Sequence, residues 1–226
     1  SRGLGDVYKR QTYDKLCSEL RERYDGYHFT HNSIGIYNPF SLLNAFKYKE
    51  FGSYWFETGT STYLVELLKK HHYDLERMAH EETDAQVLNS IDSESTNPIP
   101  VIHQSGYLTI KGYDEEFGIY RLGFPNREVE EGFIRFLLPY YASVNKVESP
   151  FEIQKFVREI RSGDYDSFFR RLQSFFADTT YEVICDQELH YENVLFIVFK
   201  LLGFYTQVEY HTNDERIDLV LNCLLY

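Results

Sequence analysis

Three carboxylates near the carboxyl end of the chain have the residue types that metal-dependent hydrolysis needs. Glu188 opens a predicted helix, Glu209 closes a predicted strand, and Asp218 lies inside a second predicted strand. Mg²⁺ takes oxygen ligands and keeps several waters when a protein binds it. Such an ion activates water and neutralises the charge that develops at a phosphodiester. If the three side chains converge, they form a magnesium site suited to phosphodiester hydrolysis.

Each of these carboxylates also has a purely structural explanation. A glutamate such as Glu188 is favoured at a helix N-terminus by the helix dipole. Glu209 suits the exposed end of a strand, and Asp218 can pair with Arg216 or with a turn amide. Spacing alone therefore leaves the catalytic and the structural interpretations open.

Other chemistry-bearing patterns are weaker. The sequence contains no GxxxxGK[ST] motif, so it has no P-loop to cradle a nucleotide phosphate. No cysteine lies at ligand spacing from the histidines, which we expect to face solvent or to cap helix ends. These histidines are His28, His31, His71, His72 and His80.

An aromatic-dense region occupies the first quarter of the chain. Platforms that stack on bases normally interleave aromatic residues with Lys or Arg, and only Lys47 and Lys49 lie nearby. A packed core or an interdomain surface is therefore the favoured interpretation. The aromatic residues concerned are Tyr24, Tyr27, Phe29, Tyr37, Phe40, Tyr54, Trp55 and Phe56.

Composition and charge narrow the class of protein. The 226 residues are 43% hydrophobic, which predicts a folded chain, and 23 basic against 35 acidic side chains give a net charge of −12. That charge opposes non-specific binding to a phosphate backbone by the chain as a whole. Cys17, Cys185 and Cys223 are far apart and are expected to be free thiols. No apolar run approaches the ~18 residues of a membrane span, so we expect a cytoplasmic protein with no membrane partner.

The pattern from residue 12 to residue 125 predicts short helices followed by a β-hairpin. Asn38 and Pro39 mark a helix start, and the helix that they begin carries Phe40, Leu43 and Phe46 toward a covering surface. A second helix follows Thr60 or Ser61, with its apolar face formed by Tyr63, Leu64, Leu67 and Leu68. Alternating residues over 107–111 and 118–122 predict the hairpin, which turns around residues 114–116. The break at residues 125–126 is the expected domain boundary.

From residue 126 to residue 221 the pattern predicts helices and then two strands. A capping box at Ser149 begins a helix whose core face is formed by Ile153, Phe156, Val157 and Ile160. Another helix follows Asp164. A helix over residues 187–202 is apolar nearly all round and should be buried. Strands are predicted at residues 205–210 and 216–221.

The two ends of the chain look foreign to the rest. Residues 1–11 show neither helical nor strand periodicity, and residues 222–226 have the same character. Both resemble translated adapter sequence at the ends of sequencing reads, so we expect them to be non-native. We accordingly expect the remaining residues to be a piece of a longer protein.

Several stretches together carry a resemblance to a known family. YDGYHF (24–29), IYNPFSLLNAF (36–46), YWFETGTSTYLVELLKK (54–70), HQSGYLTIKGYD (103–114) and LGFPNREV (122–129) resemble the lid part of bacterial AAA-ATPase-like proteins. Those proteins carry a PD-(D/E)XK nuclease domain at the C-terminus. The block over residues 188–220 resembles the first half of that nuclease domain. The matches cover most of residues 12–221.

The resemblance implies a mostly helical α+β fold. It assigns residues 12–125 to a helical lid with a hairpin, and residues 126–221 to the helical beginning and first two strands of an α/β nuclease core. Asp218 matches the metal-binding acidic residue of the PD element, and Glu188 matches the acidic residue of the preceding helix. Glu209 has a weaker match as a metal ligand. The implied reaction of the intact parent is Mg²⁺-dependent hydrolysis of nucleic acid, DNA rather than RNA, with ATP bound by an upstream domain.

The sequence departs from the family pattern after Asp218. The Glu-x-Lys element that completes the family's metal site does not follow, and the P-loop is also missing. The expectation is therefore a fragment with neither ATPase nor nuclease activity of its own, from a parent able to form homo-oligomers. The alternative, from a different class, is a non-catalytic helical module for protein interaction or regulation.

Overall fold

The computed structural model describes residues 3–56, 62–90, 97–142, 144–176 and 187–203. It is an α+β structure that is mostly helical, as predicted, with a small three-stranded antiparallel sheet. The chain divides into two compact units, Ser1–Phe133 and Ile134–Tyr226. This division falls inside helix α6 (Arg127–Tyr141), a few residues after the break expected at 125–126.

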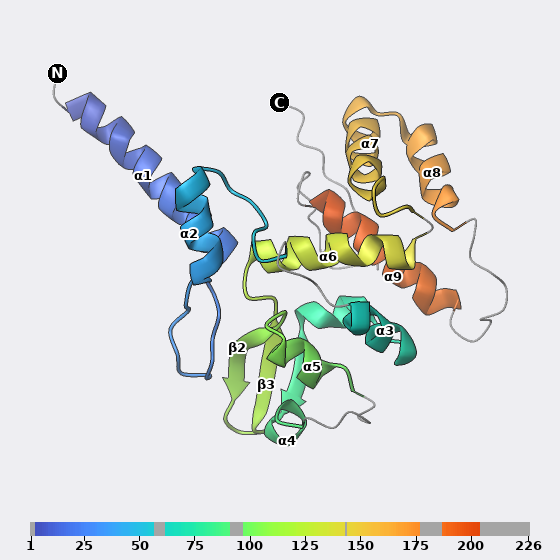
Figure 1. Ribbon diagram of the computed structural model, residues 1–226, viewed down its shortest axis with the longest axis horizontal. Helices are drawn as coiled ribbons and strands as arrows, with labels where there is room; N and C mark the ends of the chain where they lie inside the picture. Colours follow the sequence, from blue (N-terminus) through green and yellow to red (C-terminus); the bar gives the residue numbers. More distant parts are fainter. Residues whose placement is uncertain (1–2, 57–61, 91–96, 143, 177–186, 204–226) are drawn as a thin grey trace, which may run out of the picture. The chain divides into compact units, whose positions relative to one another are not determined.

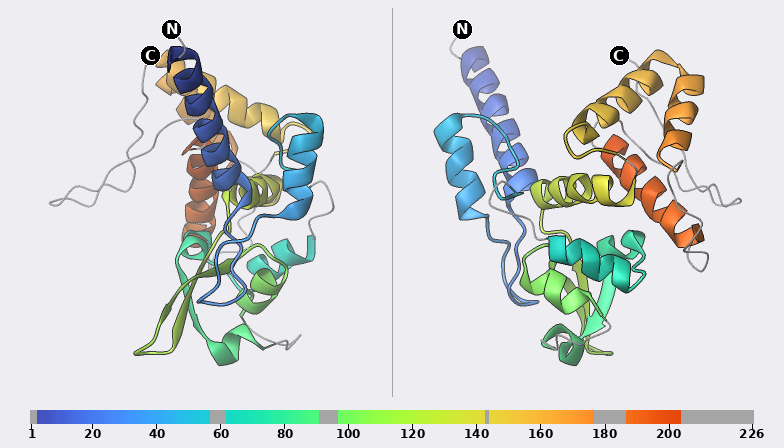
Figure 2. Two further views of the ribbon diagram at one scale, coloured as in Figure 1. Left: turned by 90° about the vertical axis from the view of Figure 1, so that its left-hand side faces the viewer. Right: turned by 45° about the vertical axis from the view of Figure 1, so that its right-hand side comes forward.

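Unit 1 begins with two helices that lie side by side, α1 (Gly3–Tyr24) and α2 (Pro39–Tyr48) (Figures 1 and 2). The backbone of α1 is helical over residues 3–11, where the sequence shows no helical periodicity. The start of α2 is as predicted. The Asn38 side chain accepts hydrogen bonds from the backbone N of Phe40 at 3.1 Å and of Ser41 at 3.3 Å, and Pro39 takes the first helical position.

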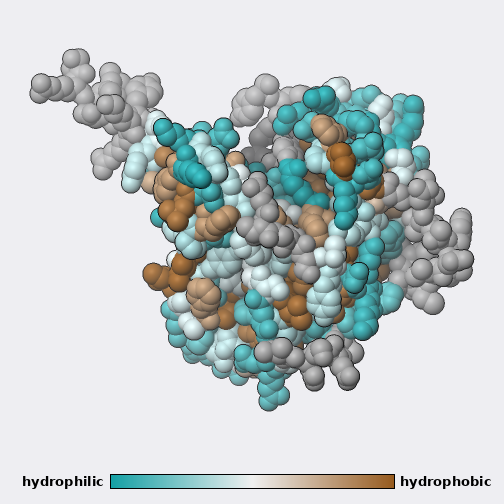
Figure 3. All heavy atoms as spheres, in the orientation of Figure 1, coloured by the Kyte–Doolittle hydropathy of each residue, from teal (hydrophilic) through white to brown (hydrophobic). Residues whose placement is uncertain are grey.

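The orientation of α2 differs from the expectation. Its small residues Ser41 and Ala45 are buried, whereas Phe40, Leu43 and Phe46 are 47%, 67% and 58% exposed. Figure 3 shows apolar side chains on the surface in the region of α2 and of the loop before it. The face that we expected to be covered is therefore open within the part of the chain that the structure describes.

The sheet has the strand order β1-β3-β2. The predicted hairpin is confirmed as β2 (Thr109–Asp114) and β3 (Ile119–Gly123), with a bulge between Ile110 and Gly112. Asp114 Oδ1 accepts hydrogen bonds from the backbone N of Glu116 and Phe117 at 3.0 and 3.1 Å, which closes the turn. A φ of +68° at Gly118 then leads the chain into β3.

Strand β1 (Glu81–Asp84) was not predicted, because its sequence EETD contains no apolar residue. Glu81 and Thr83 are nevertheless the buried members of its alternating pattern. The Tyr73 hydroxyl donates to Glu81 Oε2 at 2.6 Å, and the Arg77 guanidinium lies 3.5 Å from Glu81 Oε1. These hydrogen bonds therefore offset the cost of burying a carboxylate at a position that an apolar side chain normally occupies.

The remaining helices of unit 1 are short. They are α3 (Thr62–Lys70), the 3-10 helix η2 (Leu75–Ala79), α4 (Ala85–Leu88) and α5 (Ile99–Gln104). In α3 the predicted Leu64, Leu67 and Leu68 are buried, but Tyr63 is exposed and Val65 takes its place in the core. The predicted caps of this helix, Thr60 and Ser61, lie outside the described residues.

The described residues of unit 2 form the end of α6 and three further helices, α7 (Ser149–Ser162), α8 (Tyr165–Ser174) and α9 (Gln187–Gly203). The predicted core face of α7 is confirmed, and α7 packs against both α8 and α9. The capping box predicted at Ser149 is wrong, because Glu148 occupies the cap position and Glu152 is bound elsewhere. The strands predicted at residues 205–210 and 216–221 lie outside the described residues.

An arginine links α8 to α7. The Arg171 guanidinium donates to Glu159 Oε1 at 2.5 Å through Nη2 and to Glu152 Oε2 at 2.7 Å through Nη1. Its Nε donates to Glu159 as well, which makes the pair bidentate. The Lys155 ammonium completes the group by donating to Glu152 Oε1. Helix α8 is therefore joined to α7 by charge as well as by the packing of Phe168 on Phe156.

Gly26 gives a test of the close packing in unit 1. Its φ is +108°, and a Cβ built there would lie 2.2 Å from the carbonyl oxygen of Pro125. We expect Gly26→Ala to lower the free energy of unfolding by about 1–2 kcal/mol for the positive φ and by a further penalty for the clash. Trp55 is the single tryptophan of the chain and belongs to unit 1, so its fluorescence during urea unfolding reports the change.

The matched control is Gly118→Ala. Gly118 also has a positive φ, but the nearest atom to its added Cβ is 3.8 Å away. This variant should therefore lose only the backbone part, about 1 kcal/mol. Equal losses in the two variants would show that the approach of Gly26 to Pro125 does not constrain the fold.

Candidate functional site

The structure places one of the three predicted catalytic carboxylates. Glu188 lies in the first turn of α9 and is exposed. Asp218 and Glu209 lie outside the described residues, so their approach to Glu188 stays a prediction. Among residues that the structure does describe, no group of three or more His, Cys, Asp or Glu side chains is arranged to hold a metal ion.

The core of α9 fixes the helix that carries Glu188. Val194, Ile197, Val198 and Leu201 are fully buried, as predicted, whereas the apolar residues on the other side of the helix, Leu195, Phe196 and Phe199, are half-buried. Near the start of the helix, the His190 ring stacks on Tyr141 with 6.4 Å between centroids. Packing on this helix therefore gives Glu188 a fixed backbone position within unit 2.

In unit 1, three of the segments that carry the family resemblance meet around one buried side chain, Glu128. Its Oε1 accepts a hydrogen bond from the Ser41 hydroxyl at 2.9 Å and another from the backbone N of Trp55 at 3.0 Å. Ser41 comes from α2, Trp55 from the segment before α3, and Glu128 from the first turn of α6. We call these three residues the Glu128 cluster.

The buried position of Glu128 disfavours the charged form of its carboxyl. Burial raises the pKa of its carboxyl, while the hydrogen bonds from the Trp55 amide and the Ser41 hydroxyl oppose the rise. The neighbouring Tyr27 has a raised pKa as well, first through its own burial and then through the charge of Glu128. Both acids are therefore shifted toward their neutral forms.

Two backbone segments also meet beside this cluster. The Pro125 carbonyl oxygen accepts a hydrogen bond from Lys111 Nζ at 3.0 Å and lies against Gly26, which has no Cβ to keep it away. The next turn contains Asn126, whose Oδ1 accepts from the backbone N of Val129 at 3.1 Å and so caps α6. The first turn of α6, which carries Glu128, is therefore fixed from both sides.

Aromatic rings pack next to the cluster. Trp55 lies edge-on to Tyr107 at 4.9 Å and to Phe56 at 5.1 Å, and Tyr107 contacts Phe133 at 4.7 Å. A Cβ at Gly132 would meet the Phe56 ring at 2.2 Å, so this ring lies directly on the helix backbone. The prediction that the aromatic residues of this region pack together is confirmed for Trp55 and Phe56, whereas Phe29 and Phe40 are exposed.

The Glu128 cluster is a positioning site and not a reactive one. Glu128 is only 3% exposed, so no substrate reaches its carboxylate. From the sequence alone, Glu128 is only an acidic residue in the first turn of a helix, where the helix dipole favours negative charge. Ser41 gave the one available signal, because a small polar residue among the apolar residues of a short helix indicates a close polar contact.

One comparison with known proteins found a relative. The chain is 30% identical over 215 residues to a protein of Azotobacter chroococcum mcd 1 described as "Uncharacterized protein in vnfD 5'region". The match covers 90% of this chain and 40% of that protein, so the chain spans less than half of its length. No family model and no solved structure matches the chain. Within the described helices, none has the length and apolar character to cross a membrane.

The raised pKa of Glu128 predicts a pH dependence of stability. A protein whose carboxyl binds its proton more tightly in the folded than in the unfolded state loses stability as the pH rises above the ordinary pKa of that carboxyl, 4.5. We therefore expect the free energy of unfolding of Glu128→Gln to rise relative to that of wild type as the pH increases above about 4.5. Urea unfolding followed by Trp55 fluorescence at several pH values measures the difference.

Two further variants complete this test. Relative to Glu128→Gln, Glu128→Ala leaves the Trp55 amide and the Ser41 hydroxyl without their acceptor and should cost about 1–3 kcal/mol at every pH. Glu116→Gln removes an exposed carboxylate from the hairpin turn and should track wild type. A constant difference between wild type and Glu128→Gln across the pH range would contradict the proposed titration.

Proposed function

We propose that this chain is part of a larger ATPase-linked nuclease of the PD-(D/E)XK type, which hydrolyses nucleic-acid phosphodiesters with Mg²⁺. Unit 1 would be the lid of the ATPase part, and unit 2 the beginning of the nuclease domain. The supporting observation is the convergence on Glu128 of three segments that lie up to 87 residues apart in the sequence. These are among the segments through which the sequence resembles that family.

The convergence matters because separate motifs rarely meet by accident. Ser41, Trp55 and Glu128 belong to three different resembling stretches, and two hydrogen bonds join them at one carboxylate oxygen. Gly26 and Pro125 bring together the first and the last of these stretches. A shared structural role for these segments is what a lid common to a family requires.

The relative from Azotobacter chroococcum is also compatible with a longer parent. This chain spans 40% of that protein, which leaves more than half of its length for further domains. ATP binding is proposed for such a domain, because the present sequence has no P-loop. Nucleic acid, with DNA favoured over RNA, is the proposed substrate of the parent, and a homo-oligomer is its proposed assembly.

The proposed metal ligands are Asp218 and Glu209, with Glu188 as an accompanying catalytic acid. Of these, only Glu188 belongs to the described residues, and one exposed carboxylate does not make a Mg²⁺ site. We therefore derive no step through the ion. What supports Glu188 is its place on α9, where buried side chains hold the helix and leave the carboxylate accessible.

A second candidate function is a non-catalytic interaction module. The observation in its favour is the open face of α2 formed by Phe40, Leu43 and Phe46. The remaining part of the longer parent chain is the occupant that we assign to this face, because the relative has more than half of its length outside the matched region. In this alternative the face serves domain association, and Asp218 has no catalytic role.

Asp218 provides the test of the nuclease proposal. In a parent protein that includes a completed nuclease domain, Asp218→Ala should lower Mg²⁺-dependent cleavage of labelled DNA by about a hundredfold or more, because a metal ligand is removed. Glu188→Gln should also lower the rate. The control Asp166→Ala removes an exposed acid from the first turn of α8 and should cleave like wild type. Unchanged cleavage by Asp218→Ala would exclude the catalytic assignment.

Leu43 provides the test of the interaction alternative. Because it is 67% exposed, Leu43→Arg should change the stability of this chain by less than about 0.5 kcal/mol. In the longer parent the same change should lower the thermal midpoint, since a charge would enter a covered apolar face. The experiment compares thermal unfolding of both proteins. An equally small effect in the parent would show that the face stays open there.

A further inference from the structure

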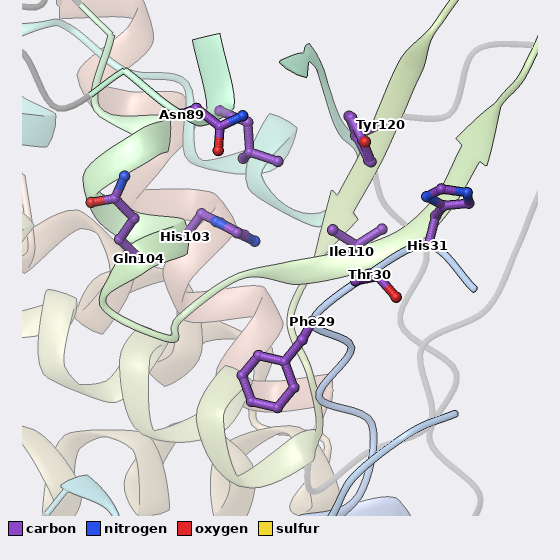
Figure 4. Close-up of a pocket in the computed structure, with 9 residues that line it drawn as sticks. Phe29, Thr30, His31, Asn89, His103, Gln104, Ile110 and Tyr120 are labelled. Atoms are coloured by element: carbon purple, nitrogen blue, oxygen red, sulfur yellow. The ribbon is translucent and has the colours of Figure 1, made fainter. Parts of the chain in front are cut away.

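We propose that unit 1 carries a pocket that binds a nucleobase through ring stacking and through hydrogen bonds to the edge of the base. The pocket has a volume of about 360 Å³ and lies between the loop at residues 29–31, helices α4 and α5, and strands β2 and β3 (Figure 4). This volume is in the range of small-ligand sites, which is about 300–1,000 Å³. The proposal does not depend on the nuclease function, because the residues from which it is argued all belong to unit 1.

An exposed aromatic ring forms one wall. Phe29 is 75% exposed, yet the loop that carries it is firmly held. The backbone N of His28 donates to Thr109 Oγ1 at 2.7 Å, and the Thr109 hydroxyl donates back to the His28 carbonyl oxygen at 2.9 Å. The His28 ring Nδ1 lies 2.8 Å from the Ser33 carbonyl oxygen. The open position of Phe29 is therefore built into the fold and prepared for a flat partner.

The loop is held on the other side of Phe29 as well. The His31 ring packs on Tyr113 with 4.6 Å between centroids and lies edge-on to Tyr120 at 6.2 Å. Tyr120 itself lines the pocket from β3. Contacts to β2 and β3 thus flank Phe29 on both sides. A ligand that stacks on Phe29 meets a wall that needs no reorganisation before binding.

Polar groups face the same space. Figure 4 shows the His103 ring pointing from α5 toward Ile110, with Asn89 and Gln104 beside it. His103 Nδ1 is buried, and it has no hydrogen-bond partner among the residues that the structure describes. Asn89 Nδ2 donates a hydrogen bond to the Ala85 carbonyl oxygen at 2.8 Å, so Oδ1 is the atom of this side chain that remains to accept one from a ligand. The side chains that line the pocket therefore include both hydrogen-bond donors and acceptors.

The lining excludes ligands that are recognised by charge. Among the described residues that line the pocket there is no Asp, Glu, Lys or Arg, and burial lowers the pKa of His103, which keeps its ring neutral near pH 7. A phosphate or carboxylate would find no Lys or Arg among these described lining residues. The buried Leu88 and Ile110 form an apolar floor. A flat, uncharged ring with donors and acceptors along its edge fits all of these features, and a nucleobase is such a ring.

Two sources supply this chemistry, a free nucleoside and an unpaired base of a nucleic-acid strand. We would titrate the ¹⁵N-labelled chain with adenosine, guanosine, cytidine and thymidine, and separately with single-stranded oligonucleotides of the same bases. Backbone amide shifts around residues 29–31 and 103–104 report binding. Binding of a nucleoside assigns the first source, and binding of oligonucleotides alone assigns the second.

Phe29→Ala and His103→Ala should each weaken the binding that is found by about tenfold or more, because they remove the stacking ring and an edge contact. Phe29→Trp should retain it. The matched control is Phe117→Ala, which removes a phenylalanine that is 71% exposed in the hairpin turn and does not line the pocket. Trp55 fluorescence during urea unfolding checks that each alanine variant folds. The proposal is overturned if no probe binds, or if Phe29→Ala and His103→Ala bind as wild type does.

Discussion

A carboxylate removed from water needs hydrogen-bond donors, and the way in which Glu128 obtains them determines how unit 1 is assembled. Its Oε1 accepts from the Ser41 hydroxyl and from the Trp55 backbone amide. Ser41 reaches Glu128 only if α2 turns its small residues inward. The Trp55 amide reaches it only if the segment before α3 passes over the start of α6. A buried acid thus specifies the placement of two elements that are distant in sequence.

Unit 2 is held by a different combination of forces. Its core is a set of phenylalanine rings and aliphatic side chains from α7, α8 and α9, of which Phe156 is fully buried. At the edge of that core, Arg171 of α8 binds Glu152 and Glu159 of α7 with bidentate geometry. Both carboxylates lie on the same side of α7, so the guanidinium fixes how α8 lies along it. The pair is partly exposed, so its main effect is on orientation.

The strongly periodic parts of the sequence could be predicted, and the parts that depend on polar contacts could not. The hairpin, the core face of α7 and the buried helix α9 follow from apolar residues at regular spacing. The cap of α2 also followed from Asn38 and Pro39. The burial of Ser41 and Ala45 in place of Phe40 and Leu43 did not, because it depends on Glu128, far away in the chain. Strand β1 has no apolar alternation at all, since Glu81 occupies a buried position with Tyr73 as its donor.

The candidate sites show the same limit. Sequence identifies Glu188 as a helix-start acid and suggests its role by resemblance, and the structure confirms the helix position. The sequence does not indicate that one pocket is lined by Phe29, Asn89, His103 and Tyr120, because these residues lie on four separate segments. Only the folding of the hairpin and of the loop fastened to Thr109 brings them together. Sites built from many short segments are therefore the least accessible to spacing arguments.

The strand order β1-β3-β2 has a consequence for how the sheet assembles during synthesis. Strands β2 and β3 are neighbours in sequence and pair through a short turn, so the hairpin can form as soon as residue 123 is available. Strand β1 is made first, yet its partners lie beyond the whole of α4, α5 and β2, with Glu81 opposite Leu122. Joining it closes a long loop, which is entropically costly. The first strand to be synthesised is thus the last to be paired, and Glu81 stays exposed to solvent until the hairpin has formed.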